Sequence, residues 1–142
     1  MAWIYPTKTT WGTILDKYVA ATNKGYRFRT VNDDRLLGYV GTDAVNRIVF
    51  YSTATINQNA WNHVVMVFNG DTIRFYFDGQ LDTISPANAI AIAVNALDVR
   101  IGISQALIEW FFGRIDEVRI FNRVLPPAEI LNIFNAEKPF HW

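Results

Sequence analysis

Apolar and polar residues alternate along most of this chain with a period of two, which is the spacing of a half-buried β-strand. The stretches Val64–Phe68 and Ile73–Phe77 are also rich in β-branched and aromatic side chains, which disfavours a helix there. The alternating runs predict strands near residues 2–5, 13–18, 25–31, 35–40, 46–53, 62–69, 72–78, 80–84, 97–103 and 111–121. Many short strands with short connections are typical of an all-β fold, an antiparallel two-sheet β-sandwich or jelly roll.

Turn residues separate these runs. Asn69-Gly70-Asp71 and Asp78-Gly79 predict tight turns between neighbouring strands. Asn32–Asp34 and Gly41–Asp43 are weaker signals of the same kind. We therefore expect the strands on either side of each turn to pair with one another.

One short C-terminal helix is predicted near residues 127–135. Pro126-Pro127 suits its first positions, where a missing backbone N–H would have no partner within the helix. Ile130, Ile133 and Phe134 share one face of this helix. We expect that face to close the end of the sandwich.

Composition limits the classes of function. The chain of 142 residues is expected to form one domain, 1–142, large enough for a two-layer core. Thirteen basic and thirteen acidic side chains cancel, which argues against a nucleic-acid partner, because such binding needs an excess of Lys and Arg. The absence of cysteine excludes disulfides and thiolate metal sites. Met1 leads into Trp3-Ile4-Tyr5 without a signal-peptide pattern, and no apolar run is long enough for membrane insertion. The cellular location stays open.

Several motifs occur in an order and spacing that together are specific: Ala2-Trp3-Ile4-Tyr5-Pro6, Thr13–Lys17, Gly25–Phe28, Trp61-Asn62-His63-Val64, Phe75–Gly79 and the run Gly113–Ile120. With them, the chain resembles the laminin-G-like domains of the concanavalin A-like lectin/glucanase superfamily over nearly its whole length. The resemblance implies a two-sheet jelly roll. It also implies a role in binding carbohydrate or protein, often as a module of secreted or surface proteins.

The chain departs from this family at its beginning. Members usually carry about one further strand pair before the Ala-Trp-Ile segment. In that fold the missing strand would lie beside Asp116–Asn122, and its absence would expose an apolar edge that favours pairing with another chain. This leads to the hypothesis of a homodimer through residues 111–122 or through the tail Phe140-His141-Trp142. The alternative is that the chain's own tail covers the edge.

Parity along three neighbouring strands predicts a shared surface. In the run 25–31, Tyr26 and Phe28 form the apolar face, which leaves Arg27 and Arg29 on the other. The same alternation in the next two strands predicts one outward face carrying Arg27, Arg29, Tyr39, Arg47 and Tyr51.

This outward face has the composition of a carbohydrate site, including one for an acidic sugar. Aromatic rings stack on the apolar faces of sugars, and guanidinium groups hydrogen-bond hydroxyls or carboxylates in pairs. Trp11, in a Thr-rich loop, and Trp110, before the last strand, are further candidates for gripping a ligand. The alternative is an ordinary solvated face of Arg–Tyr pairs, with both tryptophans used for packing.

Catalytic patterns are poor in this sequence. Glycanases on this fold use a Glu-x-Asp-x-x-Glu or Glu-x-Asp-x-Glu pattern, which is absent, and Asp116 and Glu117 are adjacent, so they would point to opposite faces of a strand. His63 is expected to be a structural, hydrogen-bonded strand histidine rather than a base. The chain is therefore predicted not to be an enzyme and to need no cofactor.

The resemblance implies one metal candidate. In this family a structural calcium can sit at the sheet rim, and Asp116 is the side chain that matches by position. The alternative is that Asp116 or Glu117 pairs with Arg114 or Arg119 at the surface. The leading hypothesis is a non-catalytic, lectin-like module that binds a carbohydrate or glycoconjugate. The second is a protein-interaction or self-associating domain that uses the C-terminal strand edge.

Overall fold

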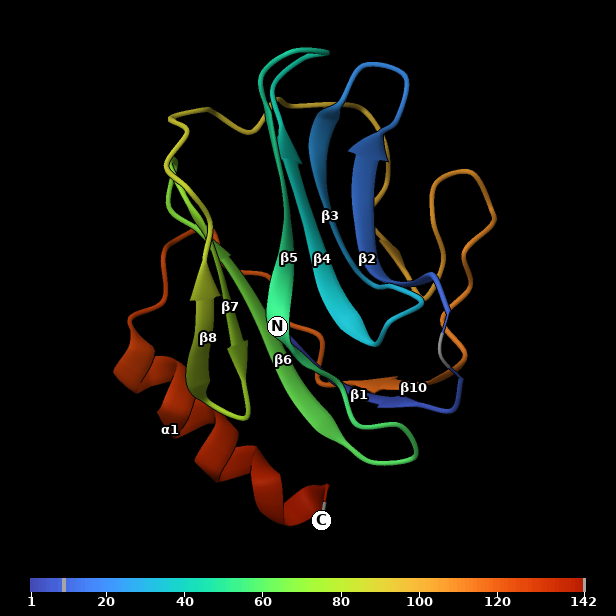
Figure 1. The fold of residues 1–142 in the computed structure, drawn as a ribbon, viewed down its shortest axis with the longest axis vertical. Helices are drawn as coiled ribbons and strands as arrows, with labels where there is room; N and C mark the ends of the chain where they lie inside the picture. The colour runs from blue at the N-terminus through green and yellow to red at the C-terminus, as the bar shows by residue number, and fades with distance from the viewer. Residues whose placement is uncertain (9, 142) are drawn as a thin grey trace.

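Two antiparallel sheets of five strands each form the body of the protein in the computed structural model, which describes residues 1–8 and 10–141 (Figure 1). The β1 sheet has the order β10 (Gly113–Asp116), β1 (Ala2–Pro6), β6 (Asn62–Phe68), β7 (Ile73–Phe77), β8 (Gln80–Ile84). The β3 sheet has the order β5 (Arg47–Thr55), β4 (Arg35–Gly41), β3 (Lys24–Thr30), β2 (Gly12–Val19), β9 (Arg100–Ile101). The predicted all-β sandwich is confirmed, as is one short C-terminal helix, α1 (Pro127–Glu137), followed by the 3-10 turn η1 (Lys138–Phe140).

The inward side chains of the two sheets form the core that the alternation predicts. Ile4, Ile14, Leu36 and Ile73 are almost completely buried there. The ring of Phe75 is central, because it stacks on rings from the opposite sheet, those of Phe28 at 6.0 Å and Phe50 at 6.2 Å. Rings stacked across the two layers hold the sheets at a common spacing.

The predicted tight turns are present. Asp78 and Gly79 both have positive φ, +48° and +78°, which is the backbone of a two-residue hairpin whose twist matches that of the strands. Gly70 also has a positive φ, +92°. These turns explain why β6, β7 and β8 are sequential neighbours in their sheet.

Two strands are much shorter than the alternation predicts. The run 97–103 contributes only β9, and the run 111–121 only β10. Positive φ angles follow directly after β9 and β10, at Gly102 (+78°) and Glu117 (+48°), and this backbone does not continue an extended strand. The C-terminal edge predicted over residues 111–122 is therefore an outer strand of four residues with an irregular continuation, and the homodimer through it stays a prediction.

The helix α1 lies on the outer face of the β1 sheet, so the expectation that it closes the end of the sandwich is wrong (Figure 1). Ile130 packs in a second buried cluster with Val65 and Tyr76, which belong to that outer face. Trp3 Nε1 donates a 2.8 Å hydrogen bond to Glu137 in the last turn of α1. Both faces of this sheet are apolar, which is why the helix covers the second one.

The chain's tail packs on the same face. The ring of His141 stacks on Trp3 with centroids 4.3 Å apart and planes 2° from parallel, and its Nε2 lies 3.4 Å from Asp116 Oδ2. Part of the tail therefore covers its own sheet, as in the alternative to dimerisation, while Trp142 lies outside the described residues.

His63 is fully buried beneath α1, between the rings of Trp3 at 5.2 Å and Phe134 at 5.7 Å. Neither of its ring nitrogens has a hydrogen-bond partner among the residues that the structure describes. Its backbone N–H instead donates to Asp78. Burial, together with nearby positive charge, lowers the pKa of His63 to about 4.

This low pKa predicts a loss of stability in acid. The unfolded chain protonates His63 near its ordinary pKa of 6.5, whereas the folded protein does so only near 4, so the stabilisation is complete above pH 6.5 and is lost as the pH falls toward 4. The loss should reach about 3 kcal/mol in the free energy of unfolding. Urea denaturation of wild type and His63→Leu at neutral and acidic pH measures it.

We expect His63→Leu to be less sensitive to acid than wild type. Phe140→Ala, which changes an exposed ring that cannot titrate, is the control and should keep the wild-type sensitivity. Equal acid sensitivity in wild type and His63→Leu would contradict the assignment.

Candidate functional site

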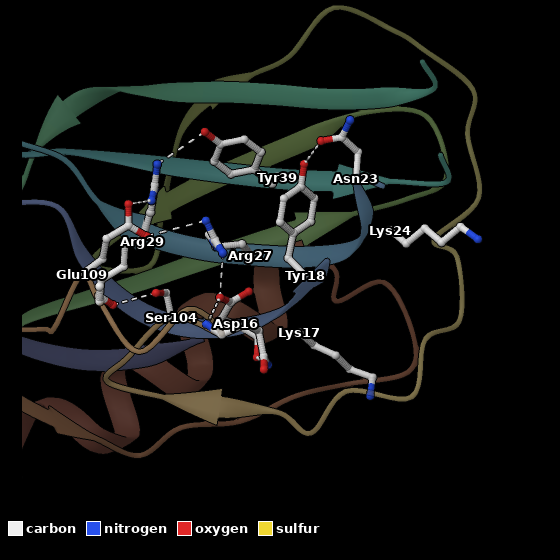
Figure 2. A network of polar contacts seen from close by, with 12 residues as sticks. Asp16, Lys17, Tyr18, Asn23, Lys24, Arg27, Arg29, Tyr39, Ser104 and Glu109 are labelled. Carbon is white, nitrogen blue, oxygen red and sulfur yellow. Dashed lines mark hydrogen bonds and ion pairs between the residues drawn. The ribbon is translucent and has the colours of Figure 1, made fainter. Parts of the chain in front are cut away.

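The outward face of the β3 sheet brings together most of the predicted site residues. Arg27 on β3 lies between Asp16 on β2 and Tyr39 on β4 in the strand register. Arg29 follows two residues later on the same face, and Tyr18 lies two residues beyond Asp16. We call these five residues, Asp16, Tyr18, Arg27, Arg29 and Tyr39, the Arg–Tyr face (Figure 2).

The two arginines of this face are covered, contrary to the expectation of an exposed face whose guanidinium groups reach a ligand, and contrary also to the alternative of a solvated face. Arg27 is only 8% exposed and Arg29 only 5%. The loop 102–112 brings Glu109 over them, with its carboxylate 2.6 Å from Arg29 Nη1 and 3.7 Å from Arg27 Nη1 (Figure 2). A buried guanidinium needs a compensating charge, and Glu109 supplies it from a distant part of the chain.

Asp16 supplies the second compensating charge. It is fully buried, lies 2.8 Å from Arg27 Nη2, and accepts a 2.8 Å hydrogen bond from the backbone N–H of Gln105. This carboxylate therefore ties the loop to β2 and β3 at the same time. Its second oxygen and the Nε atoms of Arg27 and Arg29 have no hydrogen-bond partner within residues 1–8 and 10–141.

Aromatic rings surround the guanidinium groups. Arg29 lies 4.4 Å from the ring centroid of Trp11 and 5.3 Å from that of Tyr39, whose hydroxyl is 3.4 Å from Arg29 Nη2. Arg27 lies 5.1 Å from the ring of Tyr18. Cation–π contacts of this kind fix the orientation of the rings. The arginines thus position aromatic side chains, in addition to any contact with a ligand.

Tyr18 is held at its hydroxyl as well as at its ring. Its hydroxyl donates to Asn23, and burial raises its pKa above the ordinary value. The phenol is therefore neutral at physiological pH and can act as both donor and acceptor.

Tyr51 and Arg47 lie on the same face but farther along it, on β5. Tyr51 pairs with Leu37 and Arg47 with Gly41 in the register with β4. The ring of Tyr51 is partly exposed and lies 4.8 Å from the guanidinium of Arg35. These two residues extend the face toward the sheet edge without joining the buried ion pairs.

The two candidate tryptophans differ in their surroundings. Trp11 is 36% exposed and lies against the Arg–Tyr face, in contact with Arg29. Trp110 is 57% exposed and follows Glu109 in the loop. Trp11 is thus both fixed and accessible, the combination that a stacking platform needs.

Sequence reasoning missed Asp16, Tyr18 and Glu109. Parity along 13–18 could have placed Asp16 and Tyr18 on the same face as Arg27 only with knowledge of the bulge between Thr13 and Leu15, which shifts the register. Glu109 reaches the face through the path of a long loop, and nothing local in the sequence indicates that path.

The structure places Asp116 beside Glu117 and His141, and calcium at Asp116 stays a prediction. Asp116 accepts a 2.8 Å hydrogen bond from the backbone N–H of Glu117, and its other oxygen faces His141. No group of three His, Cys, Asp or Glu side chains in the described part of the chain could hold a metal ion, whereas calcium takes six to eight oxygen ligands. Glu117 pairs with Arg119 at 3.0 Å, as in the surface alternative.

The chain belongs to the concanavalin A-like lectin/glucanase superfamily, whose family model Laminin_G_3 matches residues 1–131. No curated protein is a significant sequence match. None of the helices in residues 1–8 and 10–141 is long and apolar enough to cross a bilayer.

Solved structures share the fold at low sequence identity. The binding domain of Paraclostridial Mosquitocidal Protein 1 is 17% identical with a TM-score of 0.75, over 95% of this chain and 36% of that one. A SAP-like pentraxin from Limulus polyphemus is 16% identical (TM-score 0.70; 94% and 67%). The CBM40 of the Ruminococcus gnavus IT-sialidase, bound to α2,3 sialyllactose, is 14% identical (0.74; 94% and 79%). The chain thus spans about a third of the first of these proteins.

Removal of the Asp16 charge should destabilise the protein strongly. Asp16→Asn leaves Arg27 buried without its closest counter-ion, which is expected to cost about 3–5 kcal/mol in the free energy of unfolding. The matched control is Asp33→Asn, because Asp33 pairs with Arg35 at 2.6 Å but at the surface, where such pairs contribute little. Urea denaturation of both variants measures the difference, and equal losses would contradict the buried ion pair.

Proposed function

We propose that this protein is a non-catalytic, lectin-like binding module that takes a carbohydrate on the Arg–Tyr face. The observation that carries this proposal is the packing of Trp11 and Tyr39 against the buried guanidinium of Arg29. Fixed, partly accessible rings stack on the apolar faces of sugars at a low entropic cost. The hydroxyl of Tyr39 and the carboxylate of Glu109 are hydrogen-bonding groups beside these rings.

The charge of the face favours a neutral sugar. Arg27 and Arg29 carry two positive charges, and Asp16 and Glu109 carry two negative charges at short distances from them. An acidic sugar would meet the carboxylate of Glu109 at the place where its own carboxylate would have to bind. The acidic sugar that the sequence analysis considered is therefore a weaker candidate ligand than a neutral sugar.

The comparisons support glycans as the ligands to test first. One similar structure is a CBM40 bound to α2,3 sialyllactose, and another concerns the entry of botulinum neurotoxin type C through two ganglioside molecules. At 14% and 16% identity these similarities concern the fold, so the ligand of this chain rests on its own residues.

A glycan array with the purified chain tests the proposal. Binding to neutral glycans is expected, and Trp11→Ala and Tyr39→Ala should each weaken it about tenfold, because each removes one stacking ring. Phe140→Ala is the matched control, since Phe140 is an exposed ring that follows α1, away from the Arg–Tyr face. A folded protein that binds no glycan, or equal losses in all three variants, would refute the site.

Glu109→Gln should change the selectivity between neutral and acidic glycans. The substitution keeps the shape of the side chain and leaves Arg29 without its counter-charge. We expect affinity for sialyllactose to rise about tenfold relative to lactose, the effect of one charge-assisted hydrogen bond. Isothermal titration of both sugars with both proteins measures the ratio, and an unchanged ratio would exclude Glu109 as the residue that disfavours acidic ligands.

A further inference from the structure

The loop 102–112, which brings Glu109 to the Arg–Tyr face, also exposes large apolar side chains. The loop projects from the side of the sandwich next to β2, away from the N-terminus (Figure 1). We call four of its exposed residues the apolar tip: Leu107 (57% exposed), Ile108 (58%), Trp110 (57%) and Phe112 (46%). Single exposed apolar side chains are common on protein surfaces, whereas several in one loop indicate contact with another molecule or with a membrane.

The other side of this loop is already occupied by contacts within the protein. Glu109 pairs with Arg29, and Phe111 packs against the main core. The remaining side chains of the segment therefore point away from the sheets. Glu109 is also the only charged residue in the loop, so the apolar tip itself carries no charge.

Leu107 occupies the tip at a conformational cost. Its φ is +60°, in the left-handed region that a bulky residue adopts only with strain and that asparagine adopts more readily. Its exposure to water is unfavourable as well. Both the backbone and the solvent thus favour a small polar residue at this position, yet the chain has leucine. Positions that break two local rules at once are typical of functional sites.

Hydrogen bonds hold the tip in one shape. The backbone N–H of Leu107 donates to the carbonyl of Ser104 at 3.0 Å, and the buried hydroxyl of Ser104 donates to the carbonyl of Ile108 at 2.6 Å. The backbone N–H of Gln105 donates to Asp16, which fixes the loop to β2. The apolar side chains are therefore already arranged before they bind, and their ordering costs little free energy.

The border of the tip has the composition of a lipid interface. Lys8 is exposed there, with its Nζ 5.0 Å from the ring centroid of Phe112. Tryptophan and lysine favour the boundary between acyl chains and headgroups, where the ring is half-buried and the ammonium group reaches the phosphates. Leucine, isoleucine and phenylalanine side chains can be buried in the acyl region just below that boundary.

A second copy of the chain is a poorer occupant. Four side chains on a projecting loop offer far less than the roughly 800 Å² that each partner buries in a stable protein interface. Lipids, in contrast, rearrange around a projection and need no surface of matching shape.

We propose that the apolar tip is a membrane-contact site, which inserts into the outer part of a phospholipid bilayer. This contact is interfacial and differs from a span, which no helix of residues 1–8 and 10–141 is long and apolar enough to make. It depends on the tip residues and not on the binding of a sugar by the Arg–Tyr face.

Sedimentation with phosphatidylcholine vesicles at millimolar lipid tests the site. We expect the protein to bind, and Leu107→Asn and Ile108→Asn each to weaken binding roughly tenfold or more, because each removes one buried aliphatic side chain. Leu107→Asn should keep or raise the melting temperature, since asparagine relieves the strain, so its loss of binding is not a loss of folding. Phe140→Asn is the matched control and should bind like wild type, because Phe140 is 84% exposed but follows α1.

The depth of insertion is measured with phosphatidylcholine brominated on its acyl chains. These lipids should quench the tryptophan fluorescence, and Trp110→Phe should remove most of the quenching. No binding to vesicles, equal binding by wild type and both asparagine variants of the loop, or quenching that persists in Trp110→Phe would each overturn the proposal.

Two further measurements separate the alternatives. Self-association that Leu107→Asn abolishes, without vesicle binding, would overturn the membrane site and assign the tip to a second copy of the chain. Binding of soluble glycans should be unchanged in Leu107→Asn, so the membrane site and the glycan site fail independently. Loss of glycan binding in this variant would place Leu107 in the sugar site and overturn a separate membrane contact.

Discussion

Two guanidinium groups buried on the face of a sheet are the constraint on which the Arg–Tyr face depends. Arg27 and Arg29 are removed from water by the loop 102–112, and such a group is tolerated only where a carboxylate lies against it. Asp16 and Glu109 meet this requirement from the neighbouring strand and from the loop. The position of the loop and the orientation of the rings above β3 follow from these ion pairs. The ion pairs thus fix the geometry of the Arg–Tyr face, and aromatic rings lie against its guanidinium groups.

The two sheets have different roles as a result. The outer face of the β1 sheet carries Trp3, His63 and Val65, which pack beneath α1 and the tail. The corresponding face of the β3 sheet carries charges and phenols that no helix covers (Figure 1). Hydrophobic burial stabilises the β1 sheet on both of its faces, whereas the β3 sheet is apolar on its inner face alone.

Local patterns in the sequence predicted most of the fold. The alternation of apolar and polar residues identified the long strands and their core-facing side, because a one-residue shift in strand register would turn all the apolar side chains toward water. Asp78-Gly79 identified its hairpin, because only a few residue types adopt two consecutive left-handed conformations. The same parity placed Arg27, Arg29 and Tyr39 on one face. Their burial could not be predicted, because it depends on where the loop carrying Glu109 returns. The position of α1 was mispredicted because an apolar helix face does not say which apolar surface it meets.

Because α1 covers the outer face of the β1 sheet, the two sides of the sandwich differ. A domain with two free sheet faces can engage targets on opposite sides, whereas here the proposed platform, the Arg–Tyr face, has the C-terminal helix on the opposite side of the sandwich (Figure 1). If copies were anchored side by side through the helix side, all their platforms would point the same way. Weak individual contacts would then add up on a surface crowded with repeated targets, because binding at one platform raises the local concentration at the next.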